Sequence, residues 1–301
     1  MIDRRTLINS TAAAASIGSS RNTEAAGHSS GTQGSLSNDV EPRGSLAQGR
    51  LERLPELDME SRLDFAEGFR KWSLRDSGRK SFRRLTALLK DAGIDPTRSP
   101  PIKELLKIVS DDPVIWTAMR CKTTVQQVMW NNLVDGFHAN KTNYLAELKT
   151  AEDAGPGSLE LNAGLEIPEY AKHEIHIQPG GYIGDPLAGY VYHYGVNVFT
   201  LDLYSADTFH RDLAGIVPLP EDGKAESFLD LGTGIGQLPL ALKERFPDAS
   251  VWGIDTGAPM LRYGHMRAVE MGLDINLAQR LAEDTKFDDN SFDVITGYIL
   301  F

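Results

Sequence analysis

The sequence predicts an α/β protein, with a doubly wound parallel sheet in residues 185–301 and a helical domain before it. Two observations favour this class. An apolar strand at residues 228–231 leads directly into a glycine-rich turn and then into a helical segment at residues 239–246. A second apolar strand follows at residues 249–254. Strands that alternate with helices in this way are typical of parallel sheets.

The turn after the first strand contains three glycines spaced two apart, Gly232, Gly234 and Gly236. Glycine has no Cβ, so such a turn can bend sharply and bring its backbone N–H groups against a ligand. The helix that follows directs the positive end of its dipole to the same place. The pattern therefore predicts a loop that binds a nucleotide-containing cofactor. The alternative is a tight strand-to-helix turn with no ligand.

The spacing of the glycines separates two kinds of cofactor loop. A dinucleotide loop of the form G-x-G-x-x-G would need its third glycine at position 237, where Gln237 stands, and this disfavours a nucleotide-dependent oxidoreductase. The pattern here is D-x-G-x-G-x-G, beginning at Asp230. At the tip of the second strand, Asp255 offers two acceptor oxygens that match the two vicinal hydroxyls of a ribose.

These motifs, together with the runs at residues 256–261 and 282–295, resemble the class I S-adenosylmethionine-dependent methyltransferases. The motifs are most similar to those of the ubiquinone and menaquinone C-methyltransferase-like branch, in the style of methyltransferase type 11, and the resemblance covers residues 228–301. It implies an enzyme with a Rossmann-like sheet. The family's sheet has seven strands, and residues 291–301 would form the fourth. On this basis we expect only the first four strands, in a domain truncated at its C-terminus.

The resemblance also implies where S-adenosylmethionine, the expected cofactor, would bind. The glycine loop would hold the methionine part beside Asp230, Asp255 would bind the ribose, and Tyr298 would approach the sulfonium side. The implied cofactor-binding residues are Asp230, Gly232, Thr233, Gly234, Gly236, Asp255, Thr256, Ala282, Glu283 and Tyr298. Leu281 stands where the family usually has an Asp that accepts the adenine amino group. Glu283, a backbone carbonyl, or apolar walls with the Ala282 amide would replace that contact.

The function implied is methyl transfer to a small-molecule acceptor. The alternative is a non-catalytic cofactor-binding or interaction protein with the same fold. No residue is identified as catalytic, although His193, Tyr190 and Tyr194 are candidate bases by closeness in sequence. The two tyrosines share one helical face, where they lie over the cofactor or simply pack against neighbouring elements.

Composition narrows the partners. The 301 residues are 41% apolar and carry a formal net charge of −11. This negative charge disfavours a nucleic-acid-binding protein. No apolar run is long enough to predict a membrane span. A single cysteine, Cys121, excludes an intrachain disulfide, and His173 with His176 has no third ligand nearby, so no metal site is expected. The oligomeric state is not indicated.

The rest of the chain divides into two parts. Residues 1–50 are rich in Ser, Gly, Ala and Asn and are expected to be disordered or signal-like. Arg4 and Arg5 resemble a twin-arginine export signal, but the cofactor is made in the cytoplasm, which is therefore favoured over export to the periplasm or outside.

Residues 51–184 are expected to form a helical accessory domain and linker. Its core would come from three stripes of apolar residues at helical spacing, and its run of Arg79, Lys80, Arg83 and Arg84 would be a solvated face. The stripes are Phe65, Phe69 and Trp72; Phe82, Leu85 and Leu89; and Val125, Met129 and Leu133.

Overall fold

A computed structural model describes residues 54, 56–98, 100–200 and 207–300. The segment expected to be disordered or signal-like, residues 1–50, lies outside these. The described residues form two compact units. Residues 70–123 make up the first, which we call the helical unit, and residues 54–69 with 124–300 make up the second, the larger unit. The predicted boundary at residue 184 falls within the larger unit and stays a prediction.

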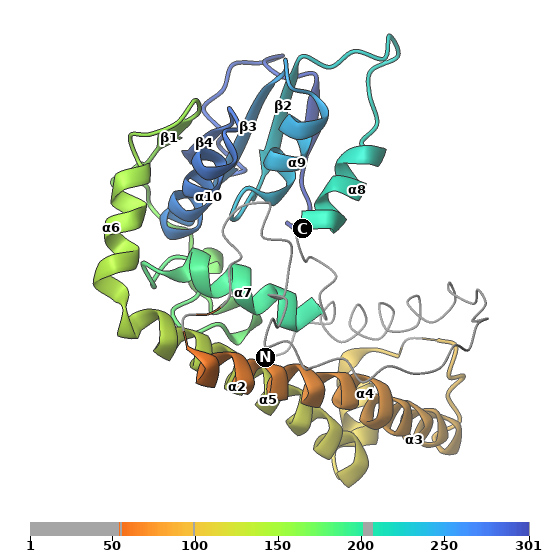
Figure 1. Cartoon of the computed structure of the whole chain (residues 1–301). Coiled ribbons are helices and arrows are strands. Elements are labelled where there is room, and N and C mark those ends of the chain that lie inside the picture. The colour runs from red at the N-terminus through yellow and green to blue at the C-terminus, as the bar shows by residue number, and fades with distance from the viewer. Residues whose placement is uncertain (1–53, 55, 99, 201–206, 301) are drawn as a thin grey trace, which may run out of the picture. The chain divides into compact units, whose positions relative to one another are not determined.

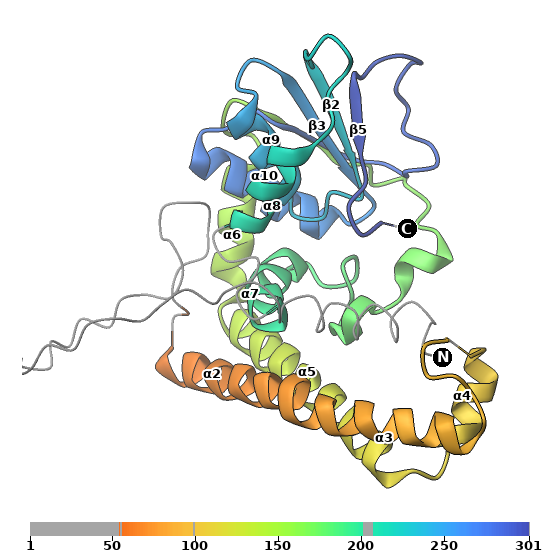
Figure 2. The same cartoon turned by 90° about the vertical axis from the view of Figure 1, so that its right-hand side faces the viewer.

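The larger unit contains a sheet of five parallel strands in the order β1-β4-β3-β2-β5, which confirms the predicted fold class (Figures 1 and 2). The chain order reverses at β2, because β3 and β4 lie on one side of it and β5 on the other. The strands are β1 (Ser158–Glu160), β2 (Ser227–Leu231), β3 (Ser250–Asp255), β4 (Asn276–Gln279) and β5 (Val294–Thr296).

The three strands located from the sequence are present as β2, β3 and β5, the remaining expected strand is β4, and β1 is an addition. It comes from the segment expected to be helices and linker, and pairs in parallel with β4. Gly157 makes the approach possible, because a Cβ there would lie 2.0 Å from the carbonyl oxygen of Ile275. Three residues are too few to show a strand's alternation, which explains why periodicity did not reveal β1.

Helices cover one face of the sheet. They are α8 (Thr208–Ile216), α9 (Gln237–Arg245) and α10 (Ala258–Met271), and Figure 1 shows α9 and α10 lying across the strands. Their core includes Phe228, Leu242 and Leu277, all fully buried. On the other face, Leu229, Ile254 and Ala278 pack with aromatic rings from the strand and loop residues Trp252, Phe287 and Phe292.

A second core of the larger unit is helical. It joins the first part of α2 (Leu57–Trp72), the later part of α5 (Pro113–Ala139), α6 (Lys141–Ala151) and α7 (Ala188–Thr200). The predicted stripe of Val125, Met129 and Leu133 is buried here, as expected. Between α6 and α7 the chain forms β1 and two short 3-10 turns, Glu169–Lys172 and Ile175–Ile177.

The helical unit contains a π-helical turn (Ser73–Ser77), α3 (Gly78–Asp91), α4 (Ile102–Val109) and the start of α5. Asp112 caps α5, because its Oδ1 accepts hydrogen bonds from the backbone N–H groups of Val114 and Ile115, each at 3.0 Å. The Arg84 Nε donates to the other carboxylate oxygen at 2.6 Å. One side chain therefore fixes the start of α5 against α3.

Two of the three predicted core stripes are only partly buried. Phe65, Trp72 and Phe82 are 68%, 46% and 61% exposed, so their assignment to the core was wrong. Helical periodicity identifies an apolar face but not whether a neighbour covers it. Among the described residues, no helix is both long and apolar enough to cross a bilayer.

We expect Gly195→Ala to destabilise the larger unit. A Cβ at Gly195 in α7 would lie 1.9 Å from the Trp130 ring, and overpacking of this kind costs about 1–3 kcal/mol. Gly68→Ala in α2 is the matched control, since a Cβ there meets nothing within 4 Å and alanine favours the helix by up to ~1 kcal/mol. Urea unfolding measures both variants. Equal midpoints for the two would contradict the close packing of α7 on α5.

Candidate functional site

The glycine loop between β2 and α9 adopts a backbone that requires glycine. Gly232, Gly234 and Gly236 have φ values of 68°, 55° and 73°, in the region that side-chain-bearing residues rarely adopt. The loop is attached to the next strand, because the backbone N–H of Thr233 donates to the Ile254 carbonyl at 3.0 Å. The Thr233 side chain is buried. Residues 232–236 therefore form a fixed turn at the carboxyl end of β2.

Asp255 joins two loops. Its Oδ2 accepts a hydrogen bond from the Gly234 N–H at 2.9 Å, and its Oδ1 accepts one from the Gly257 N–H at 2.7 Å. Burial raises the pKa of Asp255, and the bonded backbone N–H groups oppose that shift. Each carboxylate oxygen has a second lone pair, so the group can still accept from the hydroxyls of a ligand. Asp255 therefore positions the loop and offers acceptors beside it.

Asp230 lies where the chain order reverses. It ends the buried part of β2, and the Thr296 hydroxyl at the end of β5 donates to its Oδ1 at 2.7 Å. Burial raises the pKa of Asp230 to about 6, although this hydrogen bond opposes the shift. In open parallel sheets, ligands bind outside the carboxyl ends of strands at such a reversal point. Thr296 belongs to this arrangement and was not predicted.

Two tyrosines that sequence reasoning missed stand beside Asp255. The rings of Tyr182 and Tyr192 meet edge to face, with their centroids 5.4 Å apart. Burial raises the pKa of both hydroxyls, and the Asp255 carboxylate adds to the effect. Tyr298 also raises the pKa of Tyr192, and its own ring lies 5.7 Å from that of Phe209. Tyr182 and Tyr192 thus form an aromatic pair beside Asp255.

The tyrosines singled out from the sequence, Tyr190 and Tyr194, are packing residues. The Tyr190 ring lies 4.5 Å from Tyr263 and 4.8 Å from Tyr144, and the Tyr194 ring lies 5.2 Å from Phe137. Aromatic density identified the right helix, but Tyr192 is the tyrosine of α7 whose pKa the Asp255 carboxylate raises, whereas Tyr190 and Tyr194 contact core rings. The packing alternative therefore holds for both.

Ala282 and Glu283 lie in the turn after β4, which is closed by a bridge between Leu281 and Asp284. Glu283 is exposed, and it accepts a hydrogen bond from the hydroxyl of Tyr170. This bond raises the pKa of Tyr170 to about 12 and lowers the pKa of Glu283. The Gln279 side chain at the end of β4 donates to the Thr256 carbonyl at 3.0 Å. The tip of the second strand is thus hydrogen-bonded to the end of β4, from which this turn begins.

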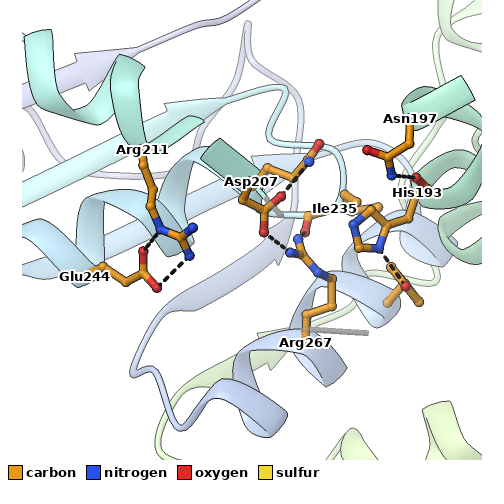
Figure 3. A network of polar contacts seen from close by, with 9 residues as sticks. His193, Asn197, Asp207, Arg211, Ile235, Glu244 and Arg267 are labelled. Atoms are coloured by element: carbon orange, nitrogen blue, oxygen red, sulfur yellow. Dashed lines mark hydrogen bonds and ion pairs between the residues drawn. The ribbon is translucent and has the colours of Figure 1, made fainter. Parts of the chain in front are cut away.

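A buried ion pair supports the glycine loop from behind (Figure 3). The Arg267 guanidinium on α10 pairs with Asp207 and donates to the Ile235 carbonyl of the loop at 3.4 Å. The Gln237 side chain at the start of α9 donates to the same Asp207 at 2.7 Å. Burial alone would raise the pKa of Asp207, but Arg267 brings it down to about 2. The pair was not predicted, because its members lie 60 residues apart.

The candidate bases do not face the loop. His193 is buried, and its Nδ1 lies 2.8 Å from the Tyr263 hydroxyl oxygen. Burial and the nearby Arg267 lower the pKa of His193 to about 3, which makes it a weak proton acceptor. Tyr190 and Tyr194 lie in the core, as described above. Among the described residues, no group of three or more His, Cys, Asp or Glu side chains could hold a metal ion.

Comparison with known proteins points to one kind of domain. A family described as "Methyltransferase domain" matches residues 228–301. A demethylmenaquinone methyltransferase of Thermus thermophilus is 39% identical over 80 residues, which cover 27% of this chain and 36% of the relative. A trans-aconitate 2-methyltransferase of Rhodopseudomonas palustris is 46% identical over 57 residues, covering 19% of this chain and 21% of the relative. The chain thus spans about a third of the first relative and a fifth of the second.

A solved structure, the plantazolicin methyltransferase BpumL in complex with a monoazolic desmethylPZN analog and SAH, is similar at 16% identity with a TM-score of 0.25. The match covers 36% of this chain and 44% of that one. This likeness is too distant to support an argument. The family match and the two relatives agree with the glycine loop and the parallel sheet. Residues 228–301 therefore match a methyltransferase domain, which confirms the resemblance to the class I S-adenosylmethionine-dependent methyltransferases.

Proposed function

We propose that the protein binds S-adenosylmethionine at the carboxyl edge of its sheet and transfers the methyl group to a small-molecule acceptor. The observation that carries this proposal is Asp255, which binds the N–H groups of Gly234 and Gly257 and thereby joins the loops after β2 and β3. These loops lie within the methyltransferase domain. The names of the two relatives, demethylmenaquinone and trans-aconitate methyltransferases, support an acceptor of small size.

The residues present fit the parts of this cofactor. Asp230 would pair with the ammonium group of the methionine part, which would lie along the backbone of Gly232, Thr233, Gly234 and Gly236. Asp255 would bind the ribose hydroxyls through its remaining lone pairs. The adenine would lie between Thr256 and the turn of Ala282 and Glu283. Tyr298, just after β5, would border the sulfonium side.

This arrangement supports methyl transfer without requiring strong acid or base catalysis. The bound cofactor supplies a methyl group that its positive sulfur already activates. The protein's task is to align the acceptor and to exclude water. Tyr182 and Tyr192 serve the second purpose, because their rings pack together beside Asp255. We assign the activity to the cytoplasm, where the cofactor is made, with twin-arginine export as the alternative.

Calorimetric titration with S-adenosylhomocysteine tests the proposal. We expect micromolar binding to the wild type, and loss of more than about tenfold in affinity in Asp255→Ala, because one ribose contact and the anchor of the glycine loop disappear together. Asp248→Ala is the matched control, since it removes an exposed acid just before the same strand. NAD is the control ligand. Urea unfolding checks that each variant is folded.

Failure of the wild type to bind S-adenosylhomocysteine would contradict the proposed function directly. So would equal binding by the Asp255→Ala and wild-type proteins, or tighter binding of NAD.

The pH dependence of binding tests the role of Asp230. Burial holds a proton on this carboxyl up to about pH 6, whereas a ligand ammonium group favours the ionised form. Affinity for S-adenosylhomocysteine should therefore be constant above pH 7 and fall by up to about tenfold per unit below pH 6. Asp230→Asn should bind more weakly at neutral pH and lose most of this slope. The same slope in both proteins would show that another group titrates.

A further inference from the structure

The strongest feature outside the cofactor site is the charge of the helical unit. Residues 70–123 hold 13 of the chain's 31 Lys and Arg residues but only 6 of its 42 Asp and Glu residues. Their formal net charge is +7, although the whole chain carries −11. The rest of the chain, taken together, is therefore strongly acidic. A concentration of positive charge of this kind indicates a partner with a negative surface.

Part of this charge is available to a partner. On α3, Arg79 pairs with Asp76 and Arg84 pairs with Asp112. Lys80 and Arg83 are exposed and form no ion pair with a described residue. They lie three residues apart, so they project from the same side of α3. On α4, Lys103 and Lys107 are exposed at a spacing of four, again on one side.

Large apolar side chains are also exposed on these helices and at the start of α5. Phe82 on α3 is 61% exposed, Leu106 on α4 is 46% exposed, and Trp116 near the start of α5 is 44% exposed. Leu106 lies three residues after Lys103, and Arg120 follows Trp116 by four, so each pair shares one side of its helix. The Trp116 indole N–H donates to the Ser110 carbonyl at 3.0 Å, which fixes this ring at the start of α5.

We propose that the helical unit docks on the surface of an anionic lipid bilayer. Short amphipathic helices with Lys and Arg beside exposed Phe, Leu and Trp bind the headgroup region in this manner, with the apolar side chains entering the acyl boundary. The cations are attracted to anionic headgroups over a distance of about the Debye length. Exposed aliphatic side chains such as Leu106 and Val114 favour lipid over nucleic acid, because they offer bases neither stacking nor hydrogen bonds.

This mode of binding requires no membrane-spanning segment, so it is compatible with the absence of such a helix from the described residues. It also uses only residues of the helical unit, and is independent of the proposed methyl transfer.

Vesicle flotation with the full chain tests the proposal. We expect binding to phosphatidylcholine vesicles that contain about one third phosphatidylglycerol, weaker binding at high salt, and little binding to pure phosphatidylcholine. Lys80→Glu/Arg83→Glu should lower the affinity by more than about tenfold. Phe82→Ser/Leu106→Ser should also weaken binding. Lys224→Glu/Lys286→Glu changes the net charge equally, at exposed sites in the larger unit, and should bind as the wild type does. Circular dichroism confirms folding.

Four outcomes would overturn the proposal. The first two are that the wild type fails to float with the anionic vesicles, or that it floats equally with neutral ones. The two double charge reversals could lower binding equally, which would indicate an effect of net charge alone. Finally, the wild type could bind duplex DNA or RNA oligonucleotides and not the vesicles, which would assign the helical unit to nucleic acid.

Discussion

The candidate site depends on one carboxylate that binds backbone N–H groups from two loops. Asp255 holds Gly234 after β2 and Gly257 after β3, so the two strand tips next to each other in the sheet share a single anchor. Hydrogen bonds from N–H groups to an ionised carboxylate are among the stronger ones in proteins. The interaction is possible because glycine at position 234 allows a φ of 55° and leaves its N–H accessible. The geometry of the glycine loop, the position of the Asp255 carboxylate beside it and the expected ribose contact all follow from this interaction.

The remaining polar contacts support this anchor from different sides. Arg267 contacts the Ile235 carbonyl of the glycine loop, and Asp207 accepts from Gln237. The attraction between the opposite charges of Arg267 and Asp207 compensates for the cost of burying both. No cation among the described residues pairs with Asp230, so burial raises its pKa, and hydrogen bonds from Thr296 and Thr233 oppose the shift. A positively charged ligand group beside Asp230 would supply the missing partner. The two buried acids thus differ: Asp207 has a cationic partner within the protein, whereas a cationic ligand would stabilise the ionised form of Asp230.

Local patterns in the sequence were sufficient for the parallel sheet and the glycine loop. The D-x-G-x-G-x-G run and Asp255 are close in sequence, and each follows a strand of ordinary length. Contacts between distant segments were not predictable in this way. Tyr182 lies in an irregular segment, which has no periodicity to interpret. Tyr192 lies on α7, and periodicity could not show which face of that helix is directed to the site. Arg267 and Thr296 meet their partners only through the fold, and β1 is too short to show a pattern. The exposure of Phe82 was likewise beyond prediction, because a helical stripe does not reveal what covers it.

A crystal structure of the protein with S-adenosylhomocysteine would show whether Asp255 binds the ribose. We expect the homocysteine part along residues 232–236, with its ammonium group beside Asp230, and both ribose hydroxyls within hydrogen-bond distance of Asp255. Asp255 would keep its bonds to Gly234 and Gly257. A ligand bound at any other edge of the sheet, or a ribose that makes no contact with Asp255, would rule out the proposed role of Asp255.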